Sequence, residues 1–105
     1  MYYIYMLRCN DNSIYTGITT DIEKRMKEHF SKNEKCAKYT KSKTAIKLEQ
    51  FWKTDTRVNA SKLEYRIKHL SKKQKEELIL FPELLSKYFN DKVDASLYKV
   101  QKNIS

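Results

Sequence analysis

The stretch YYIYMLRCNDNSIYTGIT, residues 2–19, decides the fold. Residues 2–8 are rich in Tyr and Ile and apolar at both alternating sets of positions, which predicts a strand covered on both faces. Residues 10–13 form a cluster of turn-favouring side chains, and residues 14–19 are again rich in β-branched residues. Two such runs joined by a short turn predict an antiparallel hairpin.

The length of the hairpin loop decides which side chains share a face of the sheet. A three-residue loop pairs Cys9 with Ser13, and it then places Tyr5 opposite Gly17 with Tyr15 on the same face. A loop that is one residue shorter or longer would place Tyr5 and Tyr15 on opposite faces, because side chains alternate along a strand. Gly17 is the only glycine of the chain, and a glycine inside a strand often marks the close approach of another group.

The periodicity after the hairpin predicts a small α+β domain, in which helices flank a three-stranded antiparallel sheet in the order ββαβαα. A capping box of Thr20 and Glu23 is expected to open a helix that ends near residue 30. Its buried face is predicted to carry Ile22, Met26 and Phe30. Residues 31–44 are polar and read as a loop, and residues 45–53 read as the third strand.

A second long helix is predicted from an N-cap at Asn59 to residue 70, with Ala60, Leu63, Ile67 and Leu70 inward. Ser71 and Gln74 predict a capping box for a further helix to about residue 80, which Pro82 ends. We therefore expect one domain over residues 1–81. Residues 82–105 are expected to form an extension, with a short amphipathic helix over 84–89 and a loose tail from residue 90.

Charge points to a polyanionic partner. The 105 residues hold 22 Lys and Arg against 13 Asp and Glu, a net charge of +9, with excesses over residues 22–47 and 62–75. Such clusters attract nucleic acid, with an affinity that falls as salt rises. Apolar runs of seven and four residues are too short for a membrane helix, which needs about 20.

The two cysteines, Cys9 and Cys36, predict free thiols in a reducing cytoplasm. With His29 and His69 they lack the spacing of a zinc site.

Several side chains on these elements could act together. Arg25 and His29 are four residues apart and share a face of the first helix, while Glu64 borders the buried stripe of the second. Each has an ordinary structural interpretation as well, since Glu64 and Lys68 have the spacing of a helical ion pair, and Glu28 is a helix neighbour of Arg25.

The combination is more specific than its parts: Tyr3-Ile4-Tyr5, nine intervening residues, Tyr15-Thr16-Gly17, then Arg25, His29 and Glu64. It resembles the GIY-YIG nuclease superfamily, and the small stand-alone bacterial members in particular, over residues 2–80. The chain departs from that pattern at Tyr3, where the motif has Gly, and at Thr16, where it has Ile. Many members also carry an Asn after the glutamate, and no Asn lies between Glu64 and Pro82.

The resemblance implies a metal-dependent endonuclease that hydrolyses phosphodiester bonds in DNA, with branched or damaged DNA and a role in DNA repair as candidates. It implies that Glu64 holds one Mg²⁺ or Mn²⁺ and that Arg25 grips the scissile phosphate. Tyr5 is the expected general base and Tyr15 orients water or phosphate, or the reverse, with His29 sharing proton transfer. Nearby positive charge is expected to lower the pKa of Tyr5.

We expect DNA, rather than RNA, to be bound by Gly17 and by a lysine-rich track comprising Lys35, Lys38, Tyr39, Lys41 and Lys43. One alternative is a weakly active or inactive module of the same fold that binds DNA or RNA. A second alternative is a basic scaffold for an acidic protein.

Overall fold

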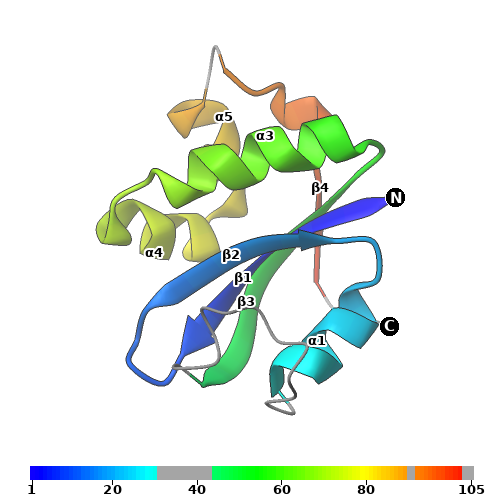
Figure 1. Cartoon of the computed structure of the whole chain (residues 1–105). Coiled ribbons are helices and arrows are strands. Elements are labelled where there is room, and N and C mark those ends of the chain that lie inside the picture. Colours follow the sequence, from blue (N-terminus) through cyan, green and yellow to red (C-terminus); the bar gives the residue numbers. More distant parts are fainter. Residues whose placement is uncertain (31–43, 90–91, 103–105) are drawn as a thin grey trace.

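The described part of the chain forms an antiparallel four-stranded sheet with helices on both faces (Figure 1). The computed structural model describes residues 1–30, 44–89 and 92–102. The strands are β1 (Tyr2–Cys9), β2 (Ile14–Thr19), β3 (Ala45–Thr54) and β4 (Lys99–Gln101), in the spatial order β2-β1-β3-β4. The predicted α+β class is confirmed, but the sheet has four strands rather than three, because residues 99–101 pair with β3.

The hairpin has the register of the three-residue loop. Tyr5 pairs with Gly17 and Leu7 with Tyr15, and the Cys9 amide donates to the Ser13 carbonyl over 3.0 Å. Asn12 closes the turn with a φ of 70°, a left-handed conformation that Asn tolerates well. Tyr5 and Tyr15 therefore lie on one face of the sheet, as that loop length predicts.

Helix α1 (Ile22–Phe30) covers this face, with Ile22 and Met26 among its buried residues. Two predictions at its ends are wrong. The first turn is capped by Asp21, whose Oδ1 accepts from the Lys24 amide over 3.1 Å, rather than by a box of Thr20 and Glu23. Phe30 is 41% exposed, and His29 is buried in its place, because a residue seven positions after Ile22 continues the buried stripe and Phe30 lies beyond it.

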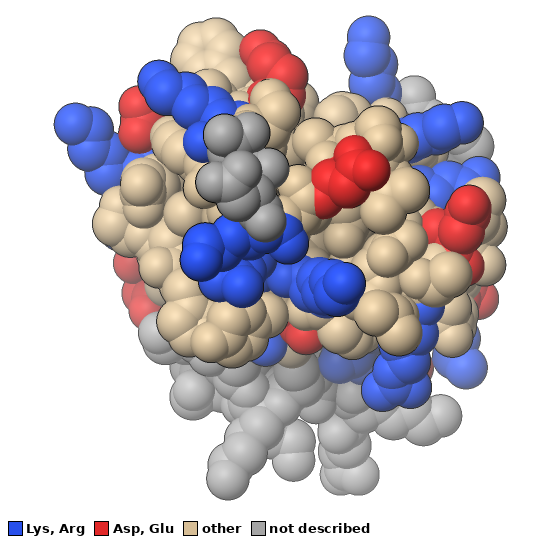
Figure 2. Space-filling model, turned by 90° about the horizontal axis from the view of Figure 1, so that it is seen from above, with Lys and Arg blue, Asp and Glu red and all other residues tan. Residues whose placement is uncertain are grey.

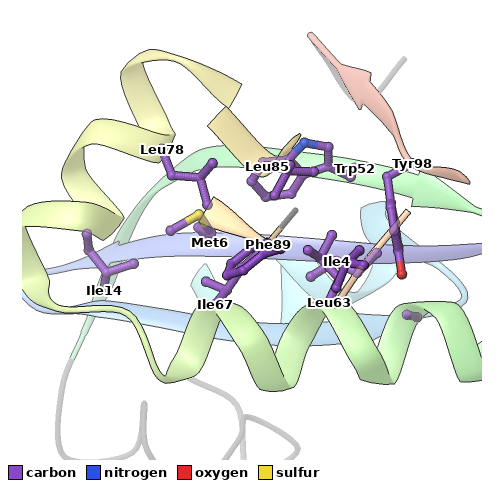
Figure 3. Close-up of a cluster of buried hydrophobic side chains, with 12 residues drawn as sticks. Ile4, Met6, Ile14, Trp52, Leu63, Ile67, Leu78, Leu85, Phe89 and Tyr98 are labelled. Carbon is purple, nitrogen blue, oxygen red and sulfur yellow. The ribbon is translucent and has the colours of Figure 1, made fainter. Parts of the chain in front are cut away.

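The opposite face is covered by α3 (Arg57–Lys68), α4 (Lys72–Leu80), the turn η1 (Pro82–Leu84) and α5 (Leu85–Tyr88). Their core surrounds Trp52, with Ile4 and Met6 of β1 and Leu63 and Ile67 of α3 (Figure 3). No helix within the described ranges is long and apolar enough to cross a membrane.

The caps of these helices were predicted in part. The Ser71–Gln74 capping box of α4 is confirmed. Helix α3, however, begins two residues before the predicted N-cap, at Arg57, because the Thr56 side chain accepts from the Asn59 amide. Asn59 is thus inside the first turn of α3.

The C-terminal segment is packed where a loose tail was expected. Val93 and Tyr98 are buried, and the turn η2 (Ala95–Leu97) leads into β4. The Tyr98 hydroxyl donates to the Asn59 carbonyl over 2.6 Å, and Thr54 Oγ1 donates to the Leu97 carbonyl. The expectation of a loose tail is therefore wrong for residues 92–102, while the division of the chain after residue 81 stays a prediction.

Candidate active site

A close contact between β1 and β2 organises the candidate site. Tyr5 is 1% exposed, and its ring lies directly over Gly17 of the neighbouring strand. A Cβ at position 17 would lie 2.5 Å from Tyr5 Oη and 2.7 Å from Tyr5 Cζ, distances that no real Cβ maintains. The lone glycine is therefore required by the aromatic ring that crosses it, since its φ is not positive.

The Tyr5 hydroxyl joins two side chains of α1. Its Oη lies 3.0 Å from Nε2 of His29 and 3.4 Å from Nε of Arg25. A guanidinium can only donate, so the hydroxyl accepts from Arg25 and its own proton points to His29. We assign the His29 tautomer from this network, with Nε2 as the acceptor.

Tyr15 completes an aromatic cluster with these groups. Its ring centroid lies 6.2 Å from that of Tyr5 and 5.6 Å from that of His29. Arg25 Nη1 forms an ion pair with Glu28 Oε1 at 2.9 Å, which holds the guanidinium between Tyr5 and Glu28. Because Arg25 and Tyr15 are only partly buried, they are the members of the cluster that a ligand can reach most directly.

Burial sets the protonation of the cluster. It raises the pKa of Tyr5 to about 12, against the opposing hydrogen bond from Arg25. The expectation that positive charge lowers this pKa is therefore wrong, because loss of solvation outweighs the guanidinium. Burial, helped by the Arg25 charge, lowers the pKa of His29 to about 4, so His29 is neutral at pH 7 and accepts a hydrogen bond from the Tyr5 hydroxyl.

Glu64 approaches the cluster from α3, on the other side of the sheet. Its negative charge is one of the influences that raise the pKa of Tyr5. Its carboxylate is 23% exposed and pairs with Lys68 at 3.3 Å, as the helical spacing predicts. The structure therefore brings Tyr5, Tyr15, Arg25 and His29 into direct contact and leaves Glu64 at their border.

The side chains of the candidate site fit a divalent ion that keeps most of its waters better than an ion surrounded by protein ligands. No three His, Cys, Asp or Glu side chains come together among the residues that the structure describes. Mg²⁺ keeps most of its waters and is commonly held by one or two carboxylates together with substrate phosphate. The single, partly exposed carboxylate of Glu64 suits such an ion.

Some predicted residues are outside this description. The track of Lys35, Lys38, Tyr39, Lys41 and Lys43 falls in residues 31–43, outside the described residues, as does Cys36. The structure adds one contact that the sequence analysis does not predict, the ion pair between Arg25 and Glu28. The i, i+3 spacing of the two residues is the sequence signal for this ion pair.

Comparisons with known proteins place the chain in a family. The model of the GIY-YIG catalytic domain family matches residues 1–77. The chain is 50% identical to the UPF0213 protein FN1575 of Fusobacterium nucleatum subsp. nucleatum over 82 residues, 78% of this chain and 80% of that protein. It is 41% identical to the UPF0213 protein YhbQ of Escherichia coli O8 over 96 residues, 88% of this chain and 94% of that protein.

A solution NMR structure of the UPF0213 protein BH0048 from Bacillus halodurans is 42% identical, covers 76% of this chain and 84% of that one, and has a TM-score of 0.49. The family match spans most of the chain and includes every residue of the aromatic cluster and Glu64. This chain therefore belongs to the GIY-YIG family, a nuclease superfamily whose members generally use divalent metal ions.

Proposed function

We propose that this protein is a metal-dependent endonuclease that hydrolyses phosphodiester bonds in DNA. The observation that carries the proposal is the Tyr5 hydroxyl, held between Arg25 Nε and His29 Nε2 beside the ring of Tyr15. Phosphodiester hydrolysis needs a positive group on the phosphate and a path for the proton of the attacking water. The cluster supplies the positive group in Arg25 and places two tyrosine hydroxyls and a neutral imidazole beside it.

Arg25 binds the scissile phosphate in this proposal. Its guanidinium is permanently charged and planar, and its contacts with Glu28 and Tyr5 fix its direction before substrate arrives. Glu64 holds one Mg²⁺ or Mn²⁺, which, when bound, stabilises charge on the phosphate and the leaving oxygen. Lys68 pairs with Oε2 of Glu64 at 3.3 Å, so it would compete with the ion for this oxygen.

Of the two role assignments for the tyrosines, burial favours the one in which Tyr15 meets the water. Tyr15 is only partly buried, whereas Tyr5 is 1% exposed with a pKa of about 12. Tyr5 then holds Arg25 and His29 in place, and its proton is already directed at a neutral imidazole. His29 accepts the hydrogen bond of the Tyr5 hydroxyl and so fixes the direction of that hydroxyl beside Arg25.

The partner is nucleic acid, as the family and the net charge of +9 suggest. DNA with branches or damage is the proposed substrate class, and DNA repair in the cytoplasm the proposed setting. Contacts from Lys35, Lys38, Tyr39, Lys41 and Lys43, with close approach of the backbone at Gly17, stay a prediction.

The test is a panel of labelled single-stranded, duplex and branched DNA, with RNA of matched length, incubated with Mg²⁺ or Mn²⁺. Wild type is compared with Glu64→Gln and Arg25→Ala, and binding is measured in parallel. We expect metal-dependent cleavage of at least one DNA, lost in both variants while Glu64→Gln still binds. Wild type that binds but cuts nothing in the panel would contradict the proposal.

The second candidate is a GIY-YIG module that binds DNA or RNA and cuts slowly or not at all. The deep burial of Tyr5 and the absence of an Asn between Glu64 and Pro82 favour it. The same panel separates the two, because this module binds with strong salt dependence and gives no product with either metal.

A further inference from the structure

A basic pocket lies on the solvent side of α3, outside the candidate active site. It has a volume of about 300 Å³ and is lined by Ser61, Lys62, Tyr65, Arg66 and Lys92, which we call the Arg66 pocket. Figure 2 looks onto the molecule from the side of α5 and α3, and basic side chains gather near the centre of that face. The pocket lies between α3, which supplies four of its lining residues, and the segment after α5, which supplies Lys92.

The lining suits a phosphate of a nucleic acid strand. It offers three cations and a serine hydroxyl, and no carboxylate is among the lining residues. Arg8, Arg25 and Lys68 are each held in an ion pair with a glutamate. The three cations of the pocket have no such ion pair within the described ranges. An arginine fork next to lysines is a common way to bind phosphate oxygens.

One aromatic ring, that of Tyr65, lines the same pocket. Tyr65 is 56% exposed, and the guanidinium of Arg66 lies 5.3 Å from the centroid of its ring. The His69 ring, tilted by 38°, packs against the Tyr65 ring with 4.2 Å between the centroids. His69 Nδ1 is 2.7 Å from the Tyr65 carbonyl, which fixes the imidazole at the end of α3. Exposed rings beside cations are the arrangement in which proteins hold unpaired nucleotides, with bases against rings and phosphates against charges.

The pocket and Glu64 are on different sides of one helix. Residues two apart on a helix point about 200° away from each other, so Arg66 faces away from the direction of Glu64. A helix with its side chains is about 10–12 Å wide, which a few nucleotides of a flexible strand can cross. A strand that passes Glu64 can therefore reach the Arg66 pocket by crossing over α3.

We propose that the Arg66 pocket is a second phosphate site, which binds an unpaired strand of the substrate a few nucleotides from the cleaved bond. The inference rests on the proposed function for its substrate, and it narrows the substrate class to DNA with a single-stranded segment. A second site of this kind lengthens the contact with the strand without taking part in chemistry.

The test compares two triple variants with the same loss of charge. Lys62→Ala/Arg66→Ala/Lys92→Ala removes the pocket cations, and Lys73→Ala/Lys99→Ala/Lys102→Ala removes three exposed lysines elsewhere. Binding of fluorescent single strands of about 4 and about 20 nucleotides is measured by anisotropy over a range of salt concentrations. Metal is omitted, so the result does not depend on cleavage.

We expect the pocket variant to lose about tenfold more affinity than the control variant for the long strand, and less than that for the short one, which cannot occupy the pocket and the candidate active site together. The slope of log affinity against log salt should fall by about 2 for the pocket variant, at roughly 0.7 for each of three contacts. Equal losses of affinity in the pocket variant and the control variant for the long strand would overturn the inference. Failure of the proposed function appears separately, as wild type that binds the long strand and never cuts it.

Discussion

At the scale of single residues, Gly17 and Tyr5 form the contact on which the candidate site depends. We expect Gly17→Ala to displace the Tyr5 ring, because its Cβ would lie 2.5 Å from Tyr5 Oη. Overpacking of this kind destabilises by about 1–3 kcal/mol, and displacement of Arg25, which Tyr5 holds in place, would cost about 10²-fold in rate. Chemical denaturation and single-turnover cleavage of the Gly17→Ala variant measure both effects, and an unchanged cleavage rate would contradict this view of Tyr5.

Thr16 is the neighbour of Gly17 that points to the other face. It is 2% exposed, and its Oγ1 has no hydrogen-bond partner within the described part of the chain. We expect Thr16→Val to raise the free energy of unfolding by about 1 kcal/mol, because it removes an unsatisfied buried hydroxyl from a nearly identical shape. Denaturant unfolding checks this, with cleavage activity expected unchanged; a less stable variant would mean that the hydroxyl is satisfied.

His29 should make stability depend on pH in a defined range. Its folded pKa of about 4 lies below the ordinary value of 6.5, so between these values the unfolded chain binds a proton that the folded protein does not. Stability from this residue is therefore complete above pH 6.5 and falls as pH drops towards 4. We expect His29→Gln to flatten the unfolding free energy between pH 6.5 and 4.5, and a profile parallel to wild type would contradict the assignment.

The sequence allowed the pairing of these residues to be predicted, but not their protonation. A three-residue loop places Tyr5 opposite Gly17, as the structure has it, and the i, i+4 spacing places Arg25 and His29 on one face of the helix. The pKa of Tyr5 depends on how deeply α1 and Tyr15 bury its hydroxyl, which no local pattern specifies. That is why charge-based reasoning predicted the wrong direction.

At the scale of elements, an ion-pair cluster ties β1 to α4. Arg8 contacts Glu76 through both terminal nitrogens and Glu49 of β3 through Nε and Nη2, and Lys72 also pairs with Glu76. The Arg8 hydrogen bonds lower the pKa of Glu76 from 4.5 to about 2. One arginine thus connects two strands and a helix at the end of the sheet away from the capped start of α1.

This depressed pKa predicts an acid-sensitive contribution. The contribution is present above pH 4.5 and is lost as pH falls from 4.5 towards 2, because the unfolded carboxyl takes up its proton first. We expect Glu76→Gln to weaken the loss of stability in that range, measured by thermal unfolding, with Glu83→Gln of the exposed η1 turn as control. Equal acid profiles for both variants would show that Glu76 contributes nothing specific.

Elements with strong periodicity or caps were predictable, and those held by distant contacts were not. The hairpin, α1, β3 and the Ser71–Gln74 box follow from local pattern. Strand β4 has only three residues and forms because Tyr98 and Leu97 are anchored to Asn59 and Thr54, far away in sequence. A short segment with isolated apolar residues gives no periodic signal.

At the scale of the whole molecule, the candidate site is assembled from both faces of one sheet. The aromatic cluster and Arg25 are on the face of α1, and Glu64 is on α3 on the other face. The sequence identified each of these residues as a candidate, and the family resemblance grouped them. Their union into one site depends on β2 being an edge strand, beside which the two helices can both reach substrate.

The most direct test of this account is a double-mutant cycle on kcat/KM for the substrate that the panel identifies. Arg25→Ala and Glu64→Gln are measured singly and together with Mg²⁺, and Arg57→Ala with Glu23→Gln serves as an exposed control pair. Residues that act as a unit give strongly non-additive losses. We predict that each single change costs about 10²-fold or more and that the double variant is little worse. Losses that multiply, or single variants as active as the control pair, would contradict a shared active site.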